Sequence, residues 1–502
     1  MYNKLFHFAL GVALLVILGC SDRSDKEKQK PNIVLILADD LGTGDVQCYH
    51  SESTIPTPNM NLLAEQGIRF TDAHSGSAVS TPTRYGIVTG RYCWRTRLKR
   101  GVLNGYSKHL ISPERTTVAS LLKREGYYTA CVGKWHLGMD YKRDTTGNVD
   151  FESPIENGPN ANGFDYFYGI AASLDFPPYV YIENNHFTKV PTEIQQQQSF
   201  PRYLRRGNKA DNFHFEKAWE HLLEKAKGVI DQQSGEDPFF LYFALPSPHK
   251  PVWPAPQFQG RTGLGPYGDF VHQTDHIVGG IIKQLKKLGI EKNTLLLVTS
   301  DNGSFMYRLD KSNGSDHLDD ETVQGYFPEN HQANYKYRGT KADIWEGGHR
   351  VPFLVQWPGT IDKGRVLDQT ICTTDFLATF ADLLNIELNE DEGGDSFSFL
   401  PLLKGNEEEY QRAPVINHSI AGMFAIRKGP YKLVLGNGSG GRQQPKGKPW
   451  RKPYFLFNLE KDISETNNII EENSPLAGEM ENKLREIMDS GTSKSKQATE
   501  YK

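Results

Sequence analysis

Short runs of apolar, often β-branched residues recur along this chain, and each ends abruptly in polar side chains. The first run, at 32–38, reads NIVLILA and is followed by Asp39 and Asp40. Similar runs span 128–132, 239–245 and 294–299. A continuous apolar run of this length predicts a strand that is buried on both faces, as in a parallel sheet. This pattern constrains the fold more than any other feature of the sequence.

The segments between these runs have helical periodicity. The predicted helices span 61–66, 118–125, 215–230 and 271–288. Gly67 and Gly126 stand where the first two would end, which is typical of a glycine after a helix. Strands that alternate with helices predict an α/β fold with a doubly wound, mixed but mostly parallel sheet flanked by helices. Ligands of such folds bind where the carboxyl ends of the strands meet.

The alternation fades after about Leu403. Beyond it, turns rich in Gly, Pro and Lys separate short apolar segments, which predict an antiparallel sheet closed by a helix at 476–488. The predicted strands span 415–417, 423–427, 431–435 and 454–458. We therefore predict a catalytic α/β domain at 31–405 and a smaller C-terminal α+β subdomain with a polar tail at 406–502.

Composition narrows the classes of function. With 502 residues, 37% hydrophobic residues and a net charge of −4, the chain is too polar for a polytopic membrane protein and too apolar for a disordered one. The near-zero charge balance also argues against a nucleic-acid partner. Five cysteines do not make a disulfide framework in a chain of this length. The sequence leaves open whether any of Cys48, Cys93, Cys131 and Cys372 form a disulfide.

The N-terminus indicates export. Residues 1–20 read MYNKLFHFALGVALLVILGC, a short positive start and an apolar run too short to span a bilayer. The run ends in Leu18-Gly19-Cys20, which resembles a bacterial lipoprotein processing site, and residues 21–30 form a polar tether. We expect a periplasmic or cell-surface protein whose membrane contact is a lipid on Cys20, in the outer membrane. Ordinary secretion with cleavage near Gly19 is the alternative.

Two pairs of oxygen-bearing side chains directly follow apolar runs. Asp39 and Asp40 follow the first run, and Asp301 and Asn302 follow the run at 294–299. Either pair alone is more typical of a helix cap or a solvated loop. Two such pairs at one sheet edge favour a hard cation, because carboxylate and amide oxygens are ligands of Ca²⁺. We predict one Ca²⁺ per chain.

A separate motif reads Ser80-Thr81-Pro82-Thr83-Arg84 and is followed by Thr89-Gly90-Arg91. Alone, it is compatible with a helix N-terminus that has a Ser or Thr cap and Pro in its first turn. Further blocks accompany it: Asp39-Asp40, Gly133-Lys134-Trp135-His136-Leu137-Gly138, Pro246-x-x-His249, Ser300-Asp301-Asn302-Gly303, and Gly339-Thr340-Lys341 with Glu346-Gly347-Gly348-x-Arg350-Val351-Pro352. Between about residues 31 and 468 this ordered set resembles the type I sulfatases of the alkaline phosphatase superfamily.

The resemblance implies an alkaline phosphatase-like fold and hydrolysis of sulfate esters. Members of the family carry Cys or Ser at the position of Ser80 and oxidise it to formylglycine. The Ser form implies a radical-type maturase that acts in the bacterial cytoplasm before export. The hydrated aldehyde suits the chemistry, because one hydroxyl attacks sulfur and the other then loses its proton to expel sulfate.

The resemblance also implies roles for the charged residues of the motifs. Arg84, Lys134 and Lys341 would place positive charge around the sulfate. His136 would take the proton in the elimination step, and His249, together with Lys341, would protonate the leaving group. The Ca²⁺ would orient the attacking oxygen and offset charge on the sulfate. Its implied ligands are Asp39, Asp40, Ser80, Asp301 and Asn302.

Sulfated carbohydrates suit an exported enzyme. The segment from Tyr85 to Gly138 looks most like sulfatases that act on hexosamine 6-sulfates of glycosaminoglycans, and an algal polysaccharide is an equally reasonable substrate. Loops at 95–106 and 174–179 would shape the sugar subsites.

Two other functions compete with a sulfatase. A phosphatase or phosphonate hydrolase of the same superfamily would need more His and Asp ligands at the strand ends, where Lys134 and Lys341 stand instead. A non-catalytic glycan-binding lipoprotein would have lost Ser80 or a metal carboxylate, and this chain retains them.

Overall fold

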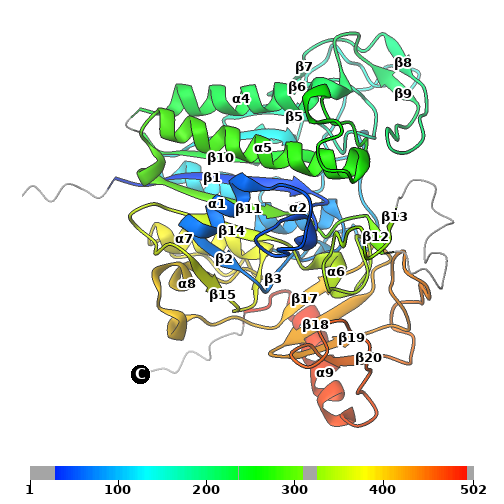
Figure 1. The fold of residues 1–502 in the computed structure, drawn as a ribbon. Coiled ribbons are helices and arrows are strands. Elements are labelled where there is room, and N and C mark those ends of the chain that lie inside the picture. The colour runs from blue at the N-terminus through cyan, green and yellow to red at the C-terminus, as the bar shows by residue number, and fades with distance from the viewer. Residues whose placement is uncertain (1–28, 236, 309–324, 495–502) are drawn as a thin grey trace, which may run out of the picture. The chain divides into compact units, whose positions relative to one another are not determined.

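A ten-stranded sheet forms the centre of the described chain, which the computed structural model covers at residues 29–235, 237–308 and 325–494 (Figure 1). The predicted signal peptide and most of the tether lie outside these residues. The strands are β1 (Asn32–Asp39), β2 (Ile68–Phe70), β4 (Tyr128–Lys134), β5 (Tyr166–Ile170), β6 (Ile182–Glu183), β7 (His186–Phe187), β10 (Phe239–Pro248), β11 (Thr294–Ser300), β14 (Phe353–Gln356) and β15 (Arg365–Leu367).

The strand order is β15-β2-β14-β11-β1-β10-β4-β5-β6-β7. The five strands from β11 to β5 in this order pair in parallel. Strand β14 runs antiparallel to both of its neighbours, and β6 returns along β5. The predicted mixed, mostly parallel sheet is therefore confirmed. Because β11, β1, β10 and β4 are neighbours with one direction, their carboxyl ends form one edge.

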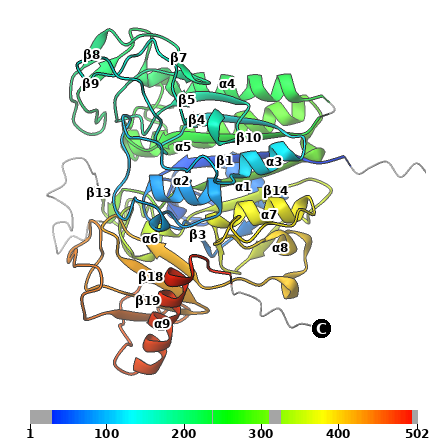
Figure 2. The same ribbon diagram turned by 180° about the vertical axis from the view of Figure 1, so that it is seen from behind.

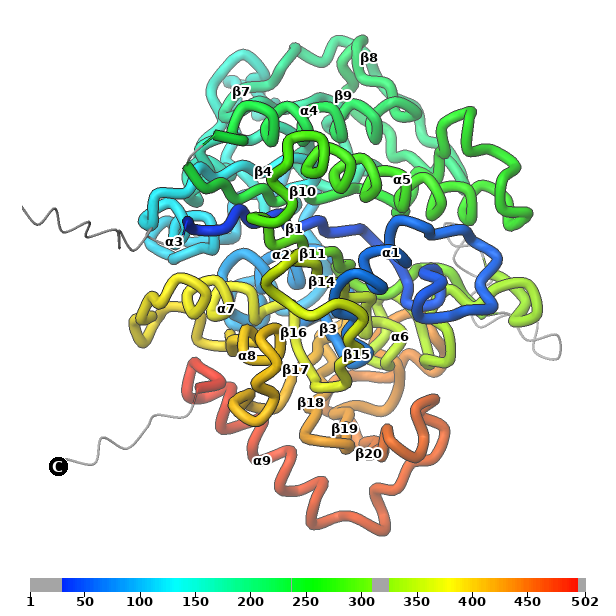
Figure 3. The backbone as a smooth tube through the Cα atoms, turned by 60° about the vertical axis from the view of Figure 1, so that its left-hand side comes forward, coloured from blue at the N-terminus to red at the C-terminus, as the bar shows by residue number. Residues whose placement is uncertain are grey.

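Helices cover both faces of this sheet. They are α1 (Pro58–Gln66), α2 (Ser80–Thr89), α3 (Val118–Arg124), α4 (Ala218–Gln233), α5 (Gly265–Lys287), α7 (Phe376–Leu383) and α8 (Leu400–Lys404). Helices α1, α4 and α5 lie on the near side in Figure 1, whereas α2, α3 and α7 face the viewer in Figure 2. Figure 3 shows α7 and α8 on the side of the sheet opposite α4 and α5.

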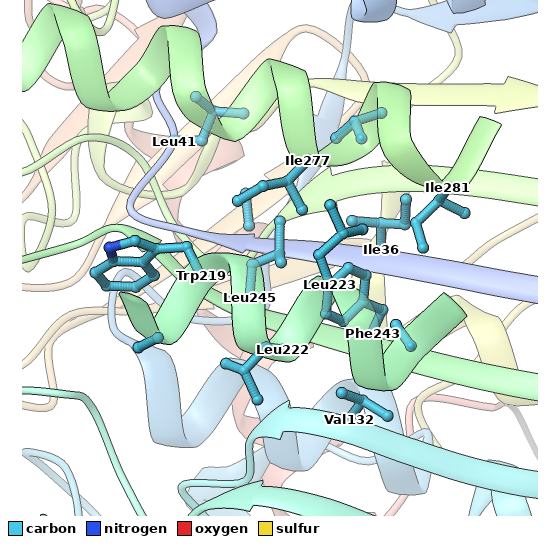
Figure 4. Packing of buried hydrophobic residues seen from close by; sticks show 14 of the residues in the cluster. Ile36, Leu41, Val132, Trp219, Leu222, Leu223, Phe243, Leu245, Ile277 and Ile281 are labelled. Carbon is cyan, nitrogen blue, oxygen red and sulfur yellow. The ribbon is translucent and has the colours of Figure 1, made fainter. Parts of the chain in front are cut away.

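The two faces of β1 explain why its sequence is apolar throughout. Val34 and Ile36 belong to the cluster beneath α4 and α5, and Ile33 and Leu35 belong to the cluster beneath α2, α3 and α7. Figure 4 shows Ile36 among Leu223, Phe243 and other side chains of the first cluster. Since both faces are covered by helices, the period-2 alternation of a half-exposed strand is absent.

The predicted elements are present with shifted ends. The first predicted helix begins at Pro58, a residue that fits a first helical turn. The fourth predicted helix begins at Gly265, and the third begins with a 3-10 turn at Phe215–Lys217. Short strands pair elsewhere: β3 (Ala73–His74) with β16 (Ile371–Cys372), β8 (Glu193–Gln195) with β9 (Gly207–Lys209), and β12 (Tyr307–Arg308) with β13 (Gly325–Tyr326).

The C-terminal segment forms the predicted antiparallel sheet. Its strands, in order, are β17 (Val415–His418), β18 (Phe424–Lys428), β19 (Tyr431–Val434) and β20 (Phe455–Asn458), and the helix is α9 (Ser474–Ser490). One face packs on Met480 and Leu484 of α9. The other packs on Trp345, beside the short helix α6 (Glu346–His349). The described residues from Pro31 onward form one compact unit when residues are grouped by their contacts. The predicted domain boundary at residue 405 stays a prediction.

A buried ion-pair cluster joins this small sheet to the main body. The Lys432 ammonium lies 3.0 Å from a Glu346 carboxylate oxygen and 2.8 Å from one of Glu465. All three side chains are almost fully buried. Opposite charges at these distances stabilise one another. Because all three are removed from solvent, the loss of Lys432 would leave a buried partner uncompensated.

None of the described helices is long and apolar enough to cross a bilayer. Cys48, Cys93, Cys131 and Cys372 are all free thiols. Cys131 is fully buried within β4, and burial raises its pKa above its ordinary value, which fits the interpretation of this residue as part of the core.

We expect Lys432→Met to lower the free energy of unfolding by about 3–5 kcal/mol, because the change removes the cation that pairs with the buried Glu465 carboxylate, while Glu346 keeps Arg350. Lys428→Met is the matched control on the neighbouring strand, since Lys428 pairs with Glu479 at the surface. That change should cost about 0–1 kcal/mol. Chemical denaturation of both variants measures the difference, and equal losses would contradict the role of the buried cluster.

Candidate active site

Four neighbouring strands bring their polar ends together. Asp39 ends β1, Lys134 ends β4, and the residues after β10 and β11 supply the others. Among the ten predicted site residues the most exposed is Lys341, at 8%. Nine of them are linked to one another by hydrogen bonds or ion pairs, and the tenth, His136, follows Lys134 by two residues. The structure therefore gathers the sequence-predicted residues in one place.

Ser80 lies at the centre of this group. Its hydroxyl donates to Asp39 Oδ1 at 3.2 Å and accepts from Lys134 Nζ at 3.1 Å. Lys134 Nζ also donates to Asp39 Oδ2 at 2.6 Å. Ser80 is the first residue of α2 and Val79 is the N-cap, with no side-chain cap bond. The helix N-terminus with Pro in its first turn is thus confirmed, whereas the Ser or Thr cap is wrong. The Ser80 side chain contacts the site instead, and the positive end of the α2 dipole lies beside it.

Arg84, one turn along α2, holds Asp301. Its Nε and Nη2 donate to Asp301 Oδ2 at 3.1 and 2.9 Å, and its Nη1 donates to the Lys134 carbonyl at 3.0 Å. Both charged side chains are fully buried. One guanidinium therefore ties α2 to the ends of β11 and β4, through three N–H groups held in one plane.

Asp40 contacts the remaining residues. Lys341 Nζ lies 2.7 and 2.8 Å from the two Asp40 oxygens, and Asn302 Nδ2 donates to Oδ1 at 2.6 Å. His249 Nε2 lies 3.6 Å from Oδ2. The Asn302 side-chain oxygen is buried and has no hydrogen-bond partner among the described residues.

The segment that carries Lys341 packs tightly on the loop after β11. A Cβ on Gly303 would lie 1.8 Å from the Gly347 carbonyl oxygen, so the backbones can approach only without that carbon. The Lys341 amide donates to the Ser304 carbonyl at 2.9 Å. These contacts place Lys341 beside the end of β11 even though it does not belong to a strand.

The two neighbouring carboxyl groups have opposite pKa shifts. Burial alone would raise the pKa of Asp39, but the charges of Lys134, Arg84 and Lys341 lower it to about 2. Burial raises the pKa of Asp40 to about 6, against the opposing charge of Lys341, and Asp39 and Asp301 add to the rise. Asp40 is therefore the carboxylate with the greatest need for positive charge.

The residues present fit a divalent metal ion. Asp39, Asp40 and His249 place potential ligand atoms within 4.8 Å of one another. Asp301 and the unpartnered oxygen of Asn302 add hard oxygen donors beside them. Lys341 adds positive charge at Asp40.

A second group of metal-type ligands, His74, Glu346 and His349, fits a cation less well. The Lys432 ammonium contacts both Glu346 and His349, at 3.0 and 3.1 Å. His74 Nδ1 lies 3.0 Å from His349 Nδ1, which is a hydrogen-bond distance. The positive charge that a metal would bring is already present there.

Burial and nearby positive charges hold the pKa of both histidines of the site well below its usual value, and the two rings lie in different environments. His136 Nε2 donates to the Leu103 carbonyl at 2.7 Å, so its unprotonated Nδ1, which has no partner among the described residues, can accept a proton. Burial, followed by the charges of Lys134 and Arg84, keeps the pKa of His136 well below its usual value. His249 Nδ1 donates to the Lys250 carbonyl at 2.6 Å, and its Nε2 faces Asp40.

Backbone strain marks two of these positions. Asp40 and His136 have φ values of 64° and 60°, in the left-handed region that residues with a Cβ seldom adopt. Each follows the end of a buried strand, where the chain turns to direct a side chain into the site. Strain of this kind persists only where surrounding contacts hold it.

The structure adds residues that the sequence analysis did not single out. Asp175, which lies within the predicted loop at 174–179, is 3.9 Å from His249 Nδ1, and its Oδ1 is buried without a hydrogen-bond partner. Arg205 forms an ion pair with Asp175, and its guanidinium lies 3.9 Å from the ring centre of Phe176. Arg205 comes from a polar loop with no motif, so its sequence carries no signal of this role.

Comparisons with known proteins agree with this geometry. A sulfatase family model matches residues 31–386, and a model described as the C-terminal region of N-sulphoglucosamine sulphohydrolase matches residues 340–490. The chain is 32% identical to an N-acetylgalactosamine-6-O-sulfatase of Bacteroides thetaiotaomicron, over 97% of this chain and 99% of the relative. It is also 32% identical to human arylsulfatase A, over 88% of this chain and 83% of that relative.

A solved structure is similar as well. The description of this structure refers to the metabolism of multiple glycosaminoglycans by Bacteroides thetaiotaomicron. The TM-score is 0.79 at 31% identity, and the match covers 92% of this chain and 100% of the other. The predicted alkaline phosphatase-like fold class is confirmed.

We expect one divalent cation to bind per chain, and Asp40→Asn to weaken that binding by more than about tenfold, because it removes a negative ligand. Asp211→Asn is the control, since Asp211 forms a surface ion pair with Lys189. Isothermal titration calorimetry with Ca²⁺ and Mg²⁺ measures both variants. Undiminished binding by Asp40→Asn would exclude Asp40 from the metal site.

Proposed function

The chain belongs to the sulfatase family and hydrolyses sulfate esters, and we propose that its substrates are carbohydrates with 6-O-sulfated N-acetylgalactosamine units. The observation that carries this proposal is the match to the Bacteroides N-acetylgalactosamine-6-O-sulfatase, which extends over 99% of that protein. A phosphatase and a non-catalytic binding protein, the two alternatives, are not supported. The family match is to sulfatases, which argues against a phosphatase. The site retains its nucleophile position and its charged residues, which argues against a non-catalytic protein.

Asp175 and Arg205 support recognition of a sugar. The buried, unpaired Asp175 oxygen beside His249 can accept a hydrogen bond from a sugar hydroxyl. Arg205 fixes the orientation of that carboxylate through its ion pair. A buried acceptor of this kind discriminates strongly, because a sugar without the matching hydroxyl would leave it unpaired.

We also propose that a maturase oxidises Ser80 to formylglycine before the chain is exported. The hydrate of this group supplies a nucleophilic oxygen and a second hydroxyl through which the aldehyde can be restored. Lys134 and Asp39 hold the side chain at this position as donor and acceptor. The start of α2 adds a positive dipole end beside the anionic sulfate. These contacts orient residue 80 toward the ester.

Ca²⁺ is the metal ion that the donor set favours. Asp39, Asp40, Asp301 and Asn302, with residue 80, would hold it, and their oxygen atoms suit a hard cation. When bound, the ion supplies positive charge that lowers the cost of negative charge on the sulfate and on the attacking oxygen. Arg84 keeps Asp301 in place through two hydrogen bonds.

Two lysines and two histidines complete the proposed mechanism. Lys134 and Lys341 place ammonium groups around the sulfate and stabilise the charge that develops there. His136 accepts a proton at its unpartnered Nδ1. His249, with Lys341, protonates the oxygen of the departing alcohol. Because neutral His249 carries its proton on Nδ1, donation from Nε2 requires a second proton on the ring.

The cellular location of the protein is inferred from its N-terminal sequence. We propose that residues 1–20 direct export to the periplasm or cell surface and that a lipid on Cys20 anchors the chain to the outer membrane. A lipid-anchored sulfatase would meet polymeric glycans at the cell envelope.

The function is tested by desulfation of defined saccharides. Protein produced with a serine-type maturase should release sulfate from N-acetylgalactosamine 6-sulfate and not from the 4-sulfate, because the Asp175 subsite fixes the sugar. Mass spectrometry should find the Ser80 peptide lighter by about two mass units, the loss of two hydrogens. Ser80→Ala is the inactive control. Release of sulfate only from the 4-sulfate, or only from carrageenan, would reject the proposed substrate.

His249→Ala should affect poor leaving groups more than good ones. A sugar alkoxide needs a proton as the S–O bond breaks, whereas a nitrophenolate scarcely does, so the rate on the sugar sulfate should fall by about 10²–10⁴-fold. The rate on 4-nitrophenyl sulfate should fall much less. His136→Ala is the comparison, since its loss should slow both substrates alike. If His249→Ala lowered the rates on both substrates equally, the protonation of the leaving group would be assigned to Lys341.

A further inference from the structure

A cationic cavity of about 550 Å³ lies between the segment that follows α2 and the small sheet with α9. Its lining includes Arg91, Lys99 and Arg100 together with Trp94 and Trp450. No Asp or Glu belongs to the lining. This cavity is separate from the residues that surround Ser80, and the proposed mechanism does not use it.

Three of the four cationic side chains in the lining form no ion pair with a carboxylate of the described residues. Arg95, also in the lining, is neutralised by Asp395 through two hydrogen bonds of 2.8 and 2.7 Å. Lys99, in contrast, donates to the Trp94 carbonyl, and Arg91 donates to the Gly491 carbonyl. The Arg100 side chain is exposed and has no hydrogen bond or ion pair with another described residue. Cations gathered in this way repel one another, so an anionic ligand would be attracted.

Two indole rings give the cavity an apolar surface. Trp94 is 6% exposed, and its buried Nε1 has no acceptor among the described residues. Trp450 is half-buried and carries Arg485 4.8 Å from its ring centre. Tyr92 stacks on the Trp94 ring with 5.6 Å between ring centres, and the Arg95 guanidinium lies 4.4 Å from the same ring, so Trp94 presents its polar edge rather than a free face. The ring of Trp450, together with the cations of the lining, therefore fits an acidic or sulfated sugar.

The segments that line the cavity are hydrogen-bonded to segments that carry residues of the candidate active site. Arg100 stands three residues before Leu103, whose carbonyl accepts from His136. The Gly101 amide donates to the Ile420 carbonyl, and the Ile420 amide donates to the carbonyl of Ala342, the neighbour of Lys341. The ten residues of α2 separate Ser80 from Arg91 by about 15 Å. A few linked sugar units would span this length.

We propose that the cationic cavity binds remote anionic sugar units of the same chain whose sulfate ester is cleaved at Ser80. This inference rests on the proposed function and extends it from a single hexosamine to an acidic polymer. The enzyme would then desulfate units within a bound chain, with the cavity holding the chain through charge and stacking.

The test compares a short with a long substrate. In the double variant Lys99→Ala/Arg100→Ala, kcat/KM for a chondroitin 6-sulfate tetrasaccharide should fall by about tenfold, because two charge-assisted contacts are lost. The value for N-acetylgalactosamine 6-sulfate should stay within about twofold. Lys483→Ala is the control, since Lys483 lies on α9 but pairs with Glu486 and does not line the cavity. Equal changes on both substrates, or none, would overturn the proposal.

A binding measurement separates this inference from the proposed function. Calorimetry with Ser80→Ala protein measures the affinity for the tetrasaccharide without turnover, and adding Lys99→Ala/Arg100→Ala should weaken it by about tenfold. This holds even if the wild type does not cleave hexosamine 6-sulfates. Phosphatidylglycerol vesicles are the second probe. Vesicle binding that the double variant loses, with unchanged or absent tetrasaccharide binding, would assign the cavity to a lipid headgroup and overturn the proposal.

Discussion

Six buried charges at one sheet edge are the constraint on which the structure depends. Three carboxylates, Asp39, Asp40 and Asp301, face three cations, Arg84, Lys134 and Lys341. An unpaired charge at such depth costs several kcal/mol, so each must meet its partner at hydrogen-bond distance. The parallel register of β11, β1, β10 and β4 fixes the carboxylates and Lys134. Helix α2 and the segment before α6 must then deliver the other two cations.

The small C-terminal sheet contributes to this arrangement although none of its residues belongs to the site. Lys341 lies in a segment that leads into α6, and Glu346 of α6 pairs with Lys432 of β19. The same segment is pressed against the loop after β11 where Gly303 meets Gly347. The distance between Lys341 and Asp40 therefore depends on packing on both sides of the segment. The small sheet therefore helps to hold Lys341 in the candidate active site.

Motifs and apolar runs predicted most of this arrangement, and what they missed has a physical cause. The buried strands were predictable because residues such as Val34 and Leu35 serve opposite faces, which forces an unbroken apolar run. The site residues were predictable because each follows such a run or lies in a motif. Strand β14, at Phe353–Gln356, is only four residues long and pairs with partners distant in sequence, so no local pattern reveals it. Arg205 was missed because a tertiary contact with Asp175 alone defines its role.

The left-handed backbone at Asp40 and His136 has a consequence for engineering. Glycine at either position would relieve backbone strain of about 1–3 kcal/mol. At Asp40, however, the same change would leave the buried Lys341 ammonium without its carboxylate, which costs at least as much. The ion pair therefore keeps the strained turn at Asp40 in place, and removing that strain is no route to a more stable protein. Stabilised forms should be sought in its surface loops and helix ends.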